Sequence, residues 1–213
     1  VTNKLNLFAD LQYRMVFYEA TSVKFDDVND TFRFFNPKAG LNYQLNTKNS
    51  FYGYFGIANK EPRRDDYESG AIKPERLFDY ELGWKYNTQK VKLSANAFYM
   101  RYNDQLVATG ELNDVGSAKF INIPKSYRLG LEIESIVNIT DKFIVQPNIT
   151  LSTAKSQDFY FQLNGNLENL GSTNLSFSPN LVAGNRFSYL PIKGLQLSVL
   201  SKFVGDQYMG NID

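Results

Sequence analysis

The chain has 213 residues, of which 43% are hydrophobic, and a formal net charge of +1, so it is neither intrinsically disordered nor basic enough to suggest a nucleic-acid partner. It contains no Cys and no His, which excludes disulfides, thiolate metal sites and the commonest general base. Seventeen Phe and 14 Tyr favour strands over helices. No run of about 18 apolar residues predicts a transmembrane helix, but transmembrane β-strands alternate and are not excluded.

The first three predicted strands are separated by polar segments. Residues 4–17 alternate, with Leu5, Leu7, Ala9, Leu11, Tyr13, Met15 and Phe17 on one face. A polar stretch at 18–33 predicts a loop, and residues 38–45 alternate again before an Asn-rich turn. Residues 51–58 are apolar on both faces, so this third strand has no predicted orientation.

The fourth predicted strand has the clearest difference between its two faces. Its apolar face carries Tyr80, Leu82, Trp84 and Tyr86. Its other face carries Asp79, Glu81, Gly83 and Lys85. Residues i and i+2 share one face of a strand, so a heavily aromatic face lies opposite a charged one.

Five further strands are predicted along the second half of the chain. They cover residues 91–99, 128–137, 143–151, 181–189 and 195–203. Pro147 lies within the third of these strands and has no N–H to donate, which counts against a regular central position for it.

The predicted connections alternate between short turns and long loops. The short turns cover residues 46–49, 87–90, 138–142 and 190–194, and the long loops cover residues 18–33, 59–76, 104–119 and 155–178. In an up-and-down sheet this alternation places all short turns at one end, as in outer-membrane barrels. We therefore predict an all-β fold with about nine antiparallel up-and-down strands.

Strand length indicates which way the apolar face points. A soluble sandwich turns this face inward, whereas a membrane barrel turns it toward lipid and lines its lumen with polar side chains. Most predicted strands exceed the usual five or six residues, and crossing a bilayer at about 45° takes about 9–11 residues. We therefore predict a transmembrane β-barrel whose lipid-facing belt includes Tyr80, Leu82, Trp84 and Tyr86.

Several segments resemble the TonB-dependent outer-membrane receptors. Residues 72–106, IKPERLFDYELGWKYNTQKVKLSANAFYMRYNDQL, carry the Lys-Pro-Glu element, the Tyr-Glu-Leu-Gly strand, the tight turn and the Asn-Ala-Phe-Tyr strand of that family. Residues 36–67 are similar to the preceding hairpin, and residues 121–135 to the Gly-x-Glu-x-Glu strand. SPNLVAGNRFSYLP and VGDQYMGN resemble later strands, so the similarity covers nearly the whole chain.

This resemblance implies a barrel of about 22 strands that is plugged by an N-terminal domain. Residues 1–213 would be a partial barrel domain, a fragment from the C-terminal half that lacks the plug and the final strand. The implied function is energised uptake of a scarce ferric siderophore or other metal chelate across the outer membrane of a Gram-negative bacterium, driven by the TonB–ExbB–ExbD system. The resemblance is to the siderophore and cobalamin type more than to the glycan type.

The densest charge cluster, EPRRDDYE at 61–68, is the first candidate ligand site. Arg suits anionic chelates because its planar fork binds carboxylate-like oxygens in a bidentate manner. The candidate ligand-binding residues here are Arg63, Arg64, Asp65, Asp66 and Tyr67. The alternative is a solvated loop whose charges neutralise one another. Tyr160, in DFYFQLNGN at 158–166, can stack on an aromatic chelate or a sugar, or belong to a hairpin above the membrane.

No catalytic residue, metal site or cofactor is predicted. Asp65 and Asp66, like FDDVND at 25–30, offer oxygens for a hard cation but lack EF-hand spacing. Glu132 and Glu134 share a strand face and are predicted to line the lumen rather than to act as a catalytic pair. An enzyme is therefore not expected. The alternatives are a soluble β-sheet protein that binds a ligand or partner, a glycan-type TonB-dependent transporter, and a passive porin or barrel enzyme.

Overall fold

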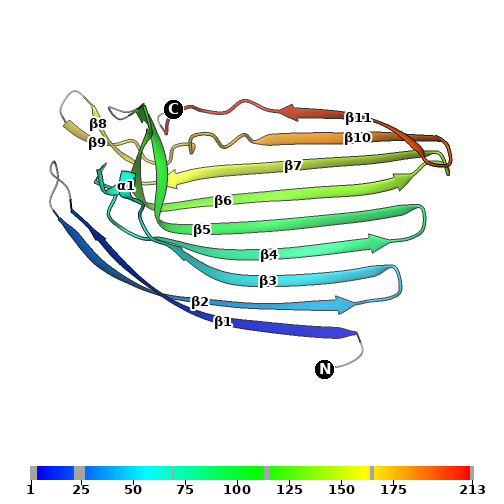
Figure 1. Ribbon diagram of the computed structural model, residues 1–213, viewed down its shortest axis with the longest axis horizontal. Helices are drawn as coiled ribbons and strands as arrows, with labels where there is room; N and C mark the ends of the chain where they lie inside the picture. Colours follow the sequence, from blue (N-terminus) through cyan, green and yellow to red (C-terminus); the bar gives the residue numbers. More distant parts are fainter. Residues whose placement is uncertain (1–3, 22–26, 69, 113–115, 164–165, 212–213) are drawn as a thin grey trace.

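A computed structural model describes residues 4–21, 27–68, 70–112, 116–163 and 166–211 of the chain. Nine strands form one antiparallel sheet in the order β1-β2-β3-β4-β5-β6-β7-β10-β11, which confirms the predicted meander (Figure 1). Their bounds are β1 (Leu5–Ala20), β2 (Val28–Gln44), β3 (Asn49–Lys60), β4 (Glu75–Asn87), β5 (Val91–Leu112), β6 (Ala118–Asn138), β7 (Phe143–Gln157), β10 (Leu181–Ile192) and β11 (Leu195–Val204). A separate hairpin pairs β8 (Tyr160–Leu163) with β9 (Asn166–Asn169), and α1 (Arg64–Glu68) is a short helix.

All four predicted short turns lie at one end of the sheet, opposite α1 and the β8–β9 hairpin (Figure 1). Side-chain oxygens hold three of them. Asn46 Oδ1 accepts the N–H groups of Lys48 and Asn49, each at 2.9 Å. Thr88 Oγ1 accepts the Val91 N–H at 3.0 Å, and Thr140 Oγ1 accepts the Phe143 N–H at 3.1 Å. These local bonds imitate backbone turns, which is why Asn and Thr occur there.

Two of the predicted long loops are largely strand, which corrects the expected boundaries. β1 continues to Ala20 and β2 begins at Val28, while β5 and β6 extend through most of residues 104–119. Backbone pairing continues in these polar segments although the apolar alternation that marks a membrane-spanning strand has ended. The β5–β6 extension passes Asp104, whose φ of 49° departs from strand geometry and which lies between the Asn103–Lys125 and Gln105–Ile123 pairs.

Pro147 lies inside β7, between β6 and β10, in spite of the expectation from its missing N–H. It pairs with Asn185 of β10. On the other side, the ladder to β6 is interrupted between the Glu134–Asn148 and Val137–Val145 pairs. The proline is accommodated where the ladder to one neighbour has a gap.

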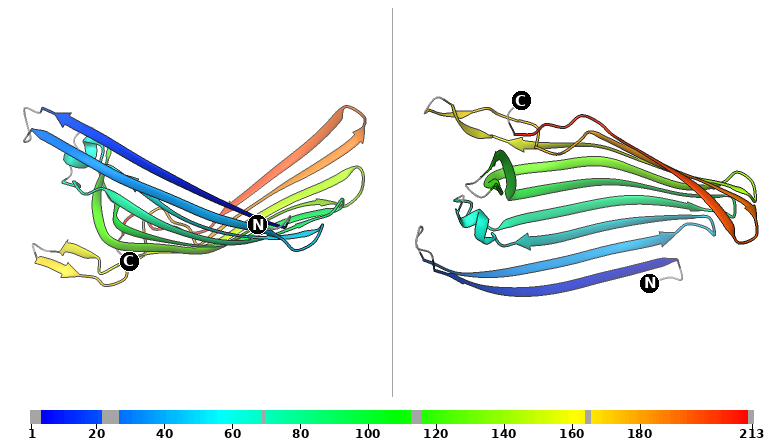
Figure 2. Two further views of the ribbon diagram at one scale, coloured as in Figure 1. Left: turned by 90° about the horizontal axis from the view of Figure 1, so that it is seen from below. Right: turned by 45° about the horizontal axis from the view of Figure 1, so that its top comes forward.

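The sheet is curved and strongly twisted, with β1–β2 and β10–β11 running in different directions (Figure 2). One face, here called the outer face, carries the side chains of Tyr80, Leu82, Trp84 and Tyr86. Its apolar residues are uncovered: Leu11 is 72% exposed and Leu82 is 71% exposed. The β3 orientation is also settled, because Phe51 and Phe55 pair with Trp84 and Tyr80 on this face. An uncovered apolar face is what a barrel presents to lipid, and it is not the inward core of a soluble sandwich.

Aromatic side chains form two groups on the outer face. Nearer the long loops, Phe55, Tyr80, Tyr99 and Tyr127 make successive ring contacts with centroids 4.9, 6.2 and 6.2 Å apart. Nearer the short turns, Trp84 lies 6.2 Å from Tyr86 and its Nε1–H donates to Asn49 Oδ1 at 3.0 Å. Two aromatic zones separated along the strands are typical of the girdles of membrane barrels.

The buried apolar cluster of the described residues lies at the long-loop end rather than along the sheet. It consists of Val107, Ile123, Ala154, Phe159 and Leu175. This cluster holds the β5–β6 extension against the segment that follows β7. No helix among the described residues is long and apolar enough to cross a bilayer.

Candidate functional site

The opposite face of the sheet, here called the inner face, carries an acidic patch. Asp79 and Glu81 lie on β4, and Glu132 and Glu134 lie on β6, two strands away. Asn96 of β5 lies between them, pairing with Gly83 and Glu132, and its Nδ2 donates to Glu81 Oε2 at 3.3 Å. The predicted placement of these charges opposite the aromatic belt follows directly from strand alternation.

Several buried polar atoms of the inner face have no hydrogen-bond partner within the described part of the chain. They are Asp79 Oδ1, Asn96 Oδ1 and Arg128 Nε. Buried polar groups normally have partners, because leaving one unpaired costs about 1–3 kcal/mol. The inner face is therefore suited to contact water or another polar protein segment.

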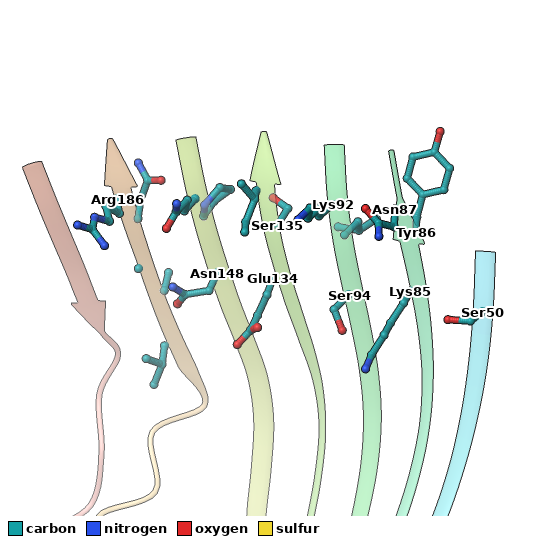
Figure 3. A pocket seen from close by; sticks show the side chains of 18 of the residues that line it. Ser50, Lys85, Tyr86, Asn87, Lys92, Ser94, Glu134, Ser135, Asn148 and Arg186 are labelled. Atoms are coloured by element: carbon teal, nitrogen blue, oxygen red, sulfur yellow. The ribbon is translucent and has the colours of Figure 1, made fainter. Parts of the chain in front are cut away.

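A hollow of ≈ 970 Å³ lies on the inner face toward the short turns. Figure 3 shows the side chains of Lys85, Glu134 and Asn148 projecting from β4, β6 and β7 along its wall. Lys48, Lys92, Arg186 and Lys202 also line it. The hollow is thus mainly basic, whereas the inner face nearer the loops is acidic.

A smaller pocket of ≈ 320 Å³ lies between the acidic patch and the segment before β10. Arg128 Nη2 donates to Ser178 Oγ at 3.2 Å, and Ser152 Oγ donates to the Pro179 carbonyl at 3.3 Å. Phe177, with φ of 52°, also lines this pocket. These contacts fold residues 176–179 across the inner face.

The charged 61–68 loop is fixed partly by its own residues and partly by other segments. Asp66 is 0% exposed, and its Oδ2 accepts the Arg63 backbone N–H at 2.7 Å and faces Arg63 Nε at 3.4 Å. The Arg63 guanidinium also lies over the Phe120 ring, 5.1 Å from its centroid. Arg64 is largely exposed and pairs with Glu68 at 3.4 Å. The charges of the loop pair with one another, as the solvated-loop alternative expected, and Arg64 stays accessible.

Tyr67 connects this loop to the β1–β2 hairpin. Its hydroxyl donates to Asp30 Oδ2 at 2.6 Å, and its ring stacks on Tyr18 with centroids 5.1 Å apart. Burial raises the pKa of Tyr67, and the hydrogen bond to the Asp30 carboxylate raises it further. Tyr67 therefore stays protonated and serves as a fixed donor. Sequence reasoning missed the contacts of this loop with Asp30, Tyr18 and Phe120, because they join segments far apart in the chain and no local pattern marks them.

Tyr160 lies elsewhere at the same end of the sheet. It begins β8 and is 52% exposed. The backbone of this segment does form a hairpin, as one of the two sequence interpretations expected. The Tyr160 ring is accessible to solvent where the hairpin begins. Of the residues suggested as a possible cation site, those at 25 and 26 lie outside the described residues, and no group of three or more acidic residues suited to a metal occurs in the part of the chain that the structure describes.

Arg14 and Glu61 form a bidentate pair at the entry to the charged loop. Arg14 Nη1 donates to Glu61 Oε1 at 2.9 Å, and Nη2 lies 2.6 Å from Oε2. The hydrogen bond from Arg14 lowers the pKa of Glu61 below its ordinary value of 4.5.

We expect the stabilising effect of Glu61 to depend on pH. Because its folded-state pKa is depressed, the contribution is complete above about pH 4.5 and disappears as the pH falls through the folded pKa. At pH 7 the Glu61→Gln variant should lose at most about 1 kcal/mol, since the pair is partly exposed. Urea unfolding of the natural protein and this variant at pH 7 and about pH 3 measures the effect. A difference that is as large in acid as at neutral pH would contradict it.

A curved antiparallel meander with an uncovered apolar outer face, a polar inner face and long connections at one end defines an outer-membrane β-barrel. The model of the family described as "TonB dependent receptor-like, beta-barrel" matches residues 2–212, so this chain belongs to that family. Its members are transport receptors of the bacterial outer membrane, which confirms the predicted location and the expectation that the chain is not an enzyme.

Solved structures show the same fold at low sequence identity. The siderophore receptor PiuA from Acinetobacter baumannii has a TM-score of 0.71 and 17% identity over 99% of this chain and 32% of PiuA. The ferric-catecholate import receptor Fiu from E. coli K12 has a TM-score of 0.69 and 16% identity over 97% of this chain and 33% of Fiu. The corresponding values for the ferric yersiniabactin uptake receptor FyuA from Yersinia pestis are 0.69 and 16%, over 99% and 33%.

The chain spans about a third of the length of these solved receptors. No curated protein sequence matches it. The nine-stranded sheet is accordingly open, with β1 and β11 at its edges, and corresponds to a fragment of a larger barrel.

Proposed function

We propose that this chain forms part of a receptor for energised import of a ferric siderophore or another metal chelate. The observation that carries the proposal is the Arg63–Tyr67 loop, which is held in place by Asp66, Asp30 and Tyr18 and keeps the Arg64 guanidinium exposed. A fixed loop presents its cation to a ligand at a lower entropic cost than a mobile loop does. The siderophore receptors of similar fold support a chelate as the substrate class.

The proposed ligand-contacting groups differ in their roles. Arg64 and Asp65 face the outside of the loop, and Tyr160 offers an exposed ring on the β8–β9 hairpin, elsewhere at the same end of the sheet. Asp66 and Tyr67 position the loop, and Arg63 is oriented between Asp66 and Phe120. An anionic chelate with aromatic rings suits a guanidinium combined with a tyrosine face.

We further propose that an N-terminal plug occupies the barrel and that the TonB–ExbB–ExbD system drives its rearrangement. The inner face fits this arrangement because its acidic patch and unpaired buried polar atoms require polar partners. Residues 1–213 would then be a partial barrel domain of a longer receptor.

The test uses a bacterium that lacks the natural gene and is complemented with it on a plasmid. Cells grow under iron limitation with single ferric chelates of the catecholate, hydroxamate and carboxylate classes, with and without an intact tonB gene. We expect one class to restore growth only when both genes are present. Arg64→Ala should weaken binding of that chelate about tenfold, as expected for loss of a charged hydrogen bond, whereas Lys142→Ala at the opposite end should not. Growth on every class without TonB, or on glycans alone, would overturn the proposal.

A further inference from the structure

The Lys-Pro-Glu element at 73–75 lies between the loop of Arg63–Tyr67, here called the ligand loop, and the body of β4. It contacts the β5–β6 extension, the part of those two strands beyond the Asn103–Lys125 pair. Figure 1 shows this extension turning away from the direction of the long strands, next to α1. The element is therefore placed to connect the ligand loop with the extension.

The β5–β6 ladder is interrupted where the extension begins. Its register places Asp104 opposite Pro124, and the pairs on either side of these two residues are present, but theirs is missing from the described ladder. Proline has no N–H to donate across the ladder, and Asp104 has a φ of 49°, outside strand geometry. The two strands can bend at this break, so the direction of the extension depends on contacts from outside the ladder.

Asn122 fastens the Lys-Pro-Glu element to the bend. Its Oδ1 accepts the Lys73 N–H at 3.1 Å, and its Nδ2 donates to the Lys73 carbonyl at 2.9 Å. The side-chain amide thus exchanges two hydrogen bonds with the Lys73 backbone, as a residue of an adjacent strand would. The same Nδ2 donates to the Asp104 carbonyl at 2.8 Å. One amide therefore joins the element to the residue at which the ladder breaks.

The charged side chains of the element make two further contacts with β5. Glu75 Oε2 accepts the Leu106 N–H at 2.9 Å, and Lys73 Nζ lies 3.5 Å from Asp104 Oδ1. Leu106 is buried, and a buried N–H that loses its acceptor is costly. The ion pair is largely exposed on its lysine side and adds little. Glu75 is therefore the second main anchor, beside Asn122.

The extension also carries a support of the ligand loop. Phe120 and Asn122 are two residues apart on β6, so they share one face of that strand. Asn122 holds Lys73, while the Phe120 ring lies against the Arg63 guanidinium, 5.1 Å from its centroid. α1 packs against β6 in the same region. A change in the angle of the extension therefore moves the ring that orients Arg63.

We propose that Glu75 and Asn122 are positioning residues of the ligand loop. They fix the angle of the β5–β6 extension, and the extension holds Arg63 through Phe120. A loop held in this way keeps the neighbouring Arg64 in place before a ligand arrives, which lowers the entropic cost of binding. The proposal rests on the proposed function only in taking this loop as the one that contacts the ligand.

Amide hydrogen exchange, followed by mass spectrometry on the full natural protein in detergent, tests the anchor first at the residues that it bonds. Glu75→Ala should speed exchange of the Leu106 N–H about tenfold, as expected for the loss of one hydrogen bond. Asn122→Ala should speed exchange of the Lys73 N–H by a similar factor.

The decisive readout is exchange in α1, where the Asp66 and Tyr67 N–H groups donate to the Arg63 carbonyl. Both variants should speed this exchange at least about twofold, the lower end of the range for one hydrogen bond. Phe120→Ala should speed it as well. Adding Asn122→Ala to Phe120→Ala should have no further effect in α1, because the two residues act through one path.

Two control variants separate positioning from general damage. Glu75→Gln keeps an oxygen for the Leu106 N–H and should exchange as the natural protein does. Asn169→Ala removes an amide at the same end of the sheet, where its Oδ1 accepts the Gly171 N–H at 2.8 Å, and should leave α1 unchanged. Exchange in α1 that ignores both anchor variants, or that either control raises equally, would overturn the proposal. If Asn122→Ala also speeds exchange in the middle of β4, the milder Glu75→Ala decides.

Binding separates this inference from the proposed function. The natural protein is titrated with ferric chelates of the catecholate, hydroxamate and carboxylate classes. The class that supports growth should bind about fivefold more weakly to Glu75→Ala and normally to Glu75→Gln. Equal binding to the natural protein and Glu75→Ala would contradict the positioning role. If no chelate binds the natural protein while exchange in α1 responds as described, the proposed function fails and the positioning role stands.

Discussion

Leu82→Arg is expected to destabilise the folded barrel by about 2–4 kcal/mol, because it places a guanidinium near the middle of the bilayer on the lipid side. Leu82 projects from the middle of β4 on the outer face, between Gly53 and Ala97, and is 71% exposed. In a water-soluble protein the same exposed substitution would change stability by no more than about 0.5 kcal/mol. The size of the loss in stability therefore shows whether lipid or water surrounds the outer face at Leu82.

Leu112→Arg is the matched control. Leu112 is 64% exposed, nearly as much as Leu82, but it lies at the tip of the β5–β6 extension, beyond the aromatic residues nearer the long loops. Urea titrations of folding into lipid vesicles, carried out on the full natural protein, give the free energy for both variants. Similar small losses for the two variants would contradict the assignment of the outer face to lipid.

Gly130→Ala is expected to cost about 1–3 kcal/mol, the usual range for overpacking. Gly130 lies on the inner face between Phe98 of β5 and Ser152 of β7. A Cβ atom there would lie 2.7 Å from the Leu151 carbonyl oxygen and would overlap the Phe98 ring. The ring can turn aside, but the carbonyl belongs to a strand paired on both sides and cannot move without disturbing its ladder.

Gly53→Ala provides a comparison on the outer face. The nearest atom to its added Cβ would be Leu82 Cδ2 at 3.5 Å, an ordinary contact. We expect no loss of stability and a gain of up to about 1 kcal/mol from reduced freedom of the unfolded chain.

Phe98→Leu combined with Gly130→Ala should recover part of the stability that Gly130→Ala loses, because the smaller side chain removes the overlap with the ring. Equal effects at Gly53 and Gly130 would show that the inner-face packing is not as described.

Strand order and facing could be predicted because they depend on local information. Alternation with period two defines the faces of β1 and β4 directly, and the Asn- and Thr-containing turns are local hydrogen-bond motifs. The up-and-down order then follows from short turns that permit no other neighbour.

The extents of the strands above the membrane could not be predicted in the same way. β5 continues to Leu112 without apolar alternation. Beyond the membrane the outer face does not need apolar side chains, and backbone pairing with β6 is enough to maintain the strand. β3 had no predictable orientation, because Tyr52 and Tyr54 on the inner face are as aromatic as Phe51 and Phe55 on the outer face. The pairing with β4 decides it, and Tyr52 packs over Gly83.

The candidate site was only partly predictable for the same reason. The composition of residues 61–68 indicates a charged loop, but its conformation depends on Asp30, Tyr18 and Phe120 from other hairpins. The burial of Asp66 likewise depends on the local fold of α1, which brings the Arg63 N–H onto its carboxylate.

The most direct test of the account measures whether lipid or water surrounds each side chain of β4 in the membrane. These 213 residues contain no Cys. Once any Cys elsewhere in the full protein is replaced by Ser, single Cys replacements from Asp79 to Tyr86, and one at Leu112, can carry nitroxide labels in the protein reconstituted in lipid. Spin relaxation by oxygen, which concentrates in lipid, and by a water-soluble nickel complex is then measured at each position. The account predicts high oxygen and low nickel accessibility at Tyr80, Leu82 and Trp84, with oxygen accessibility falling at the intervening positions. Accessibility that does not alternate, or nickel access at Leu82 equal to that at Leu112, would contradict it.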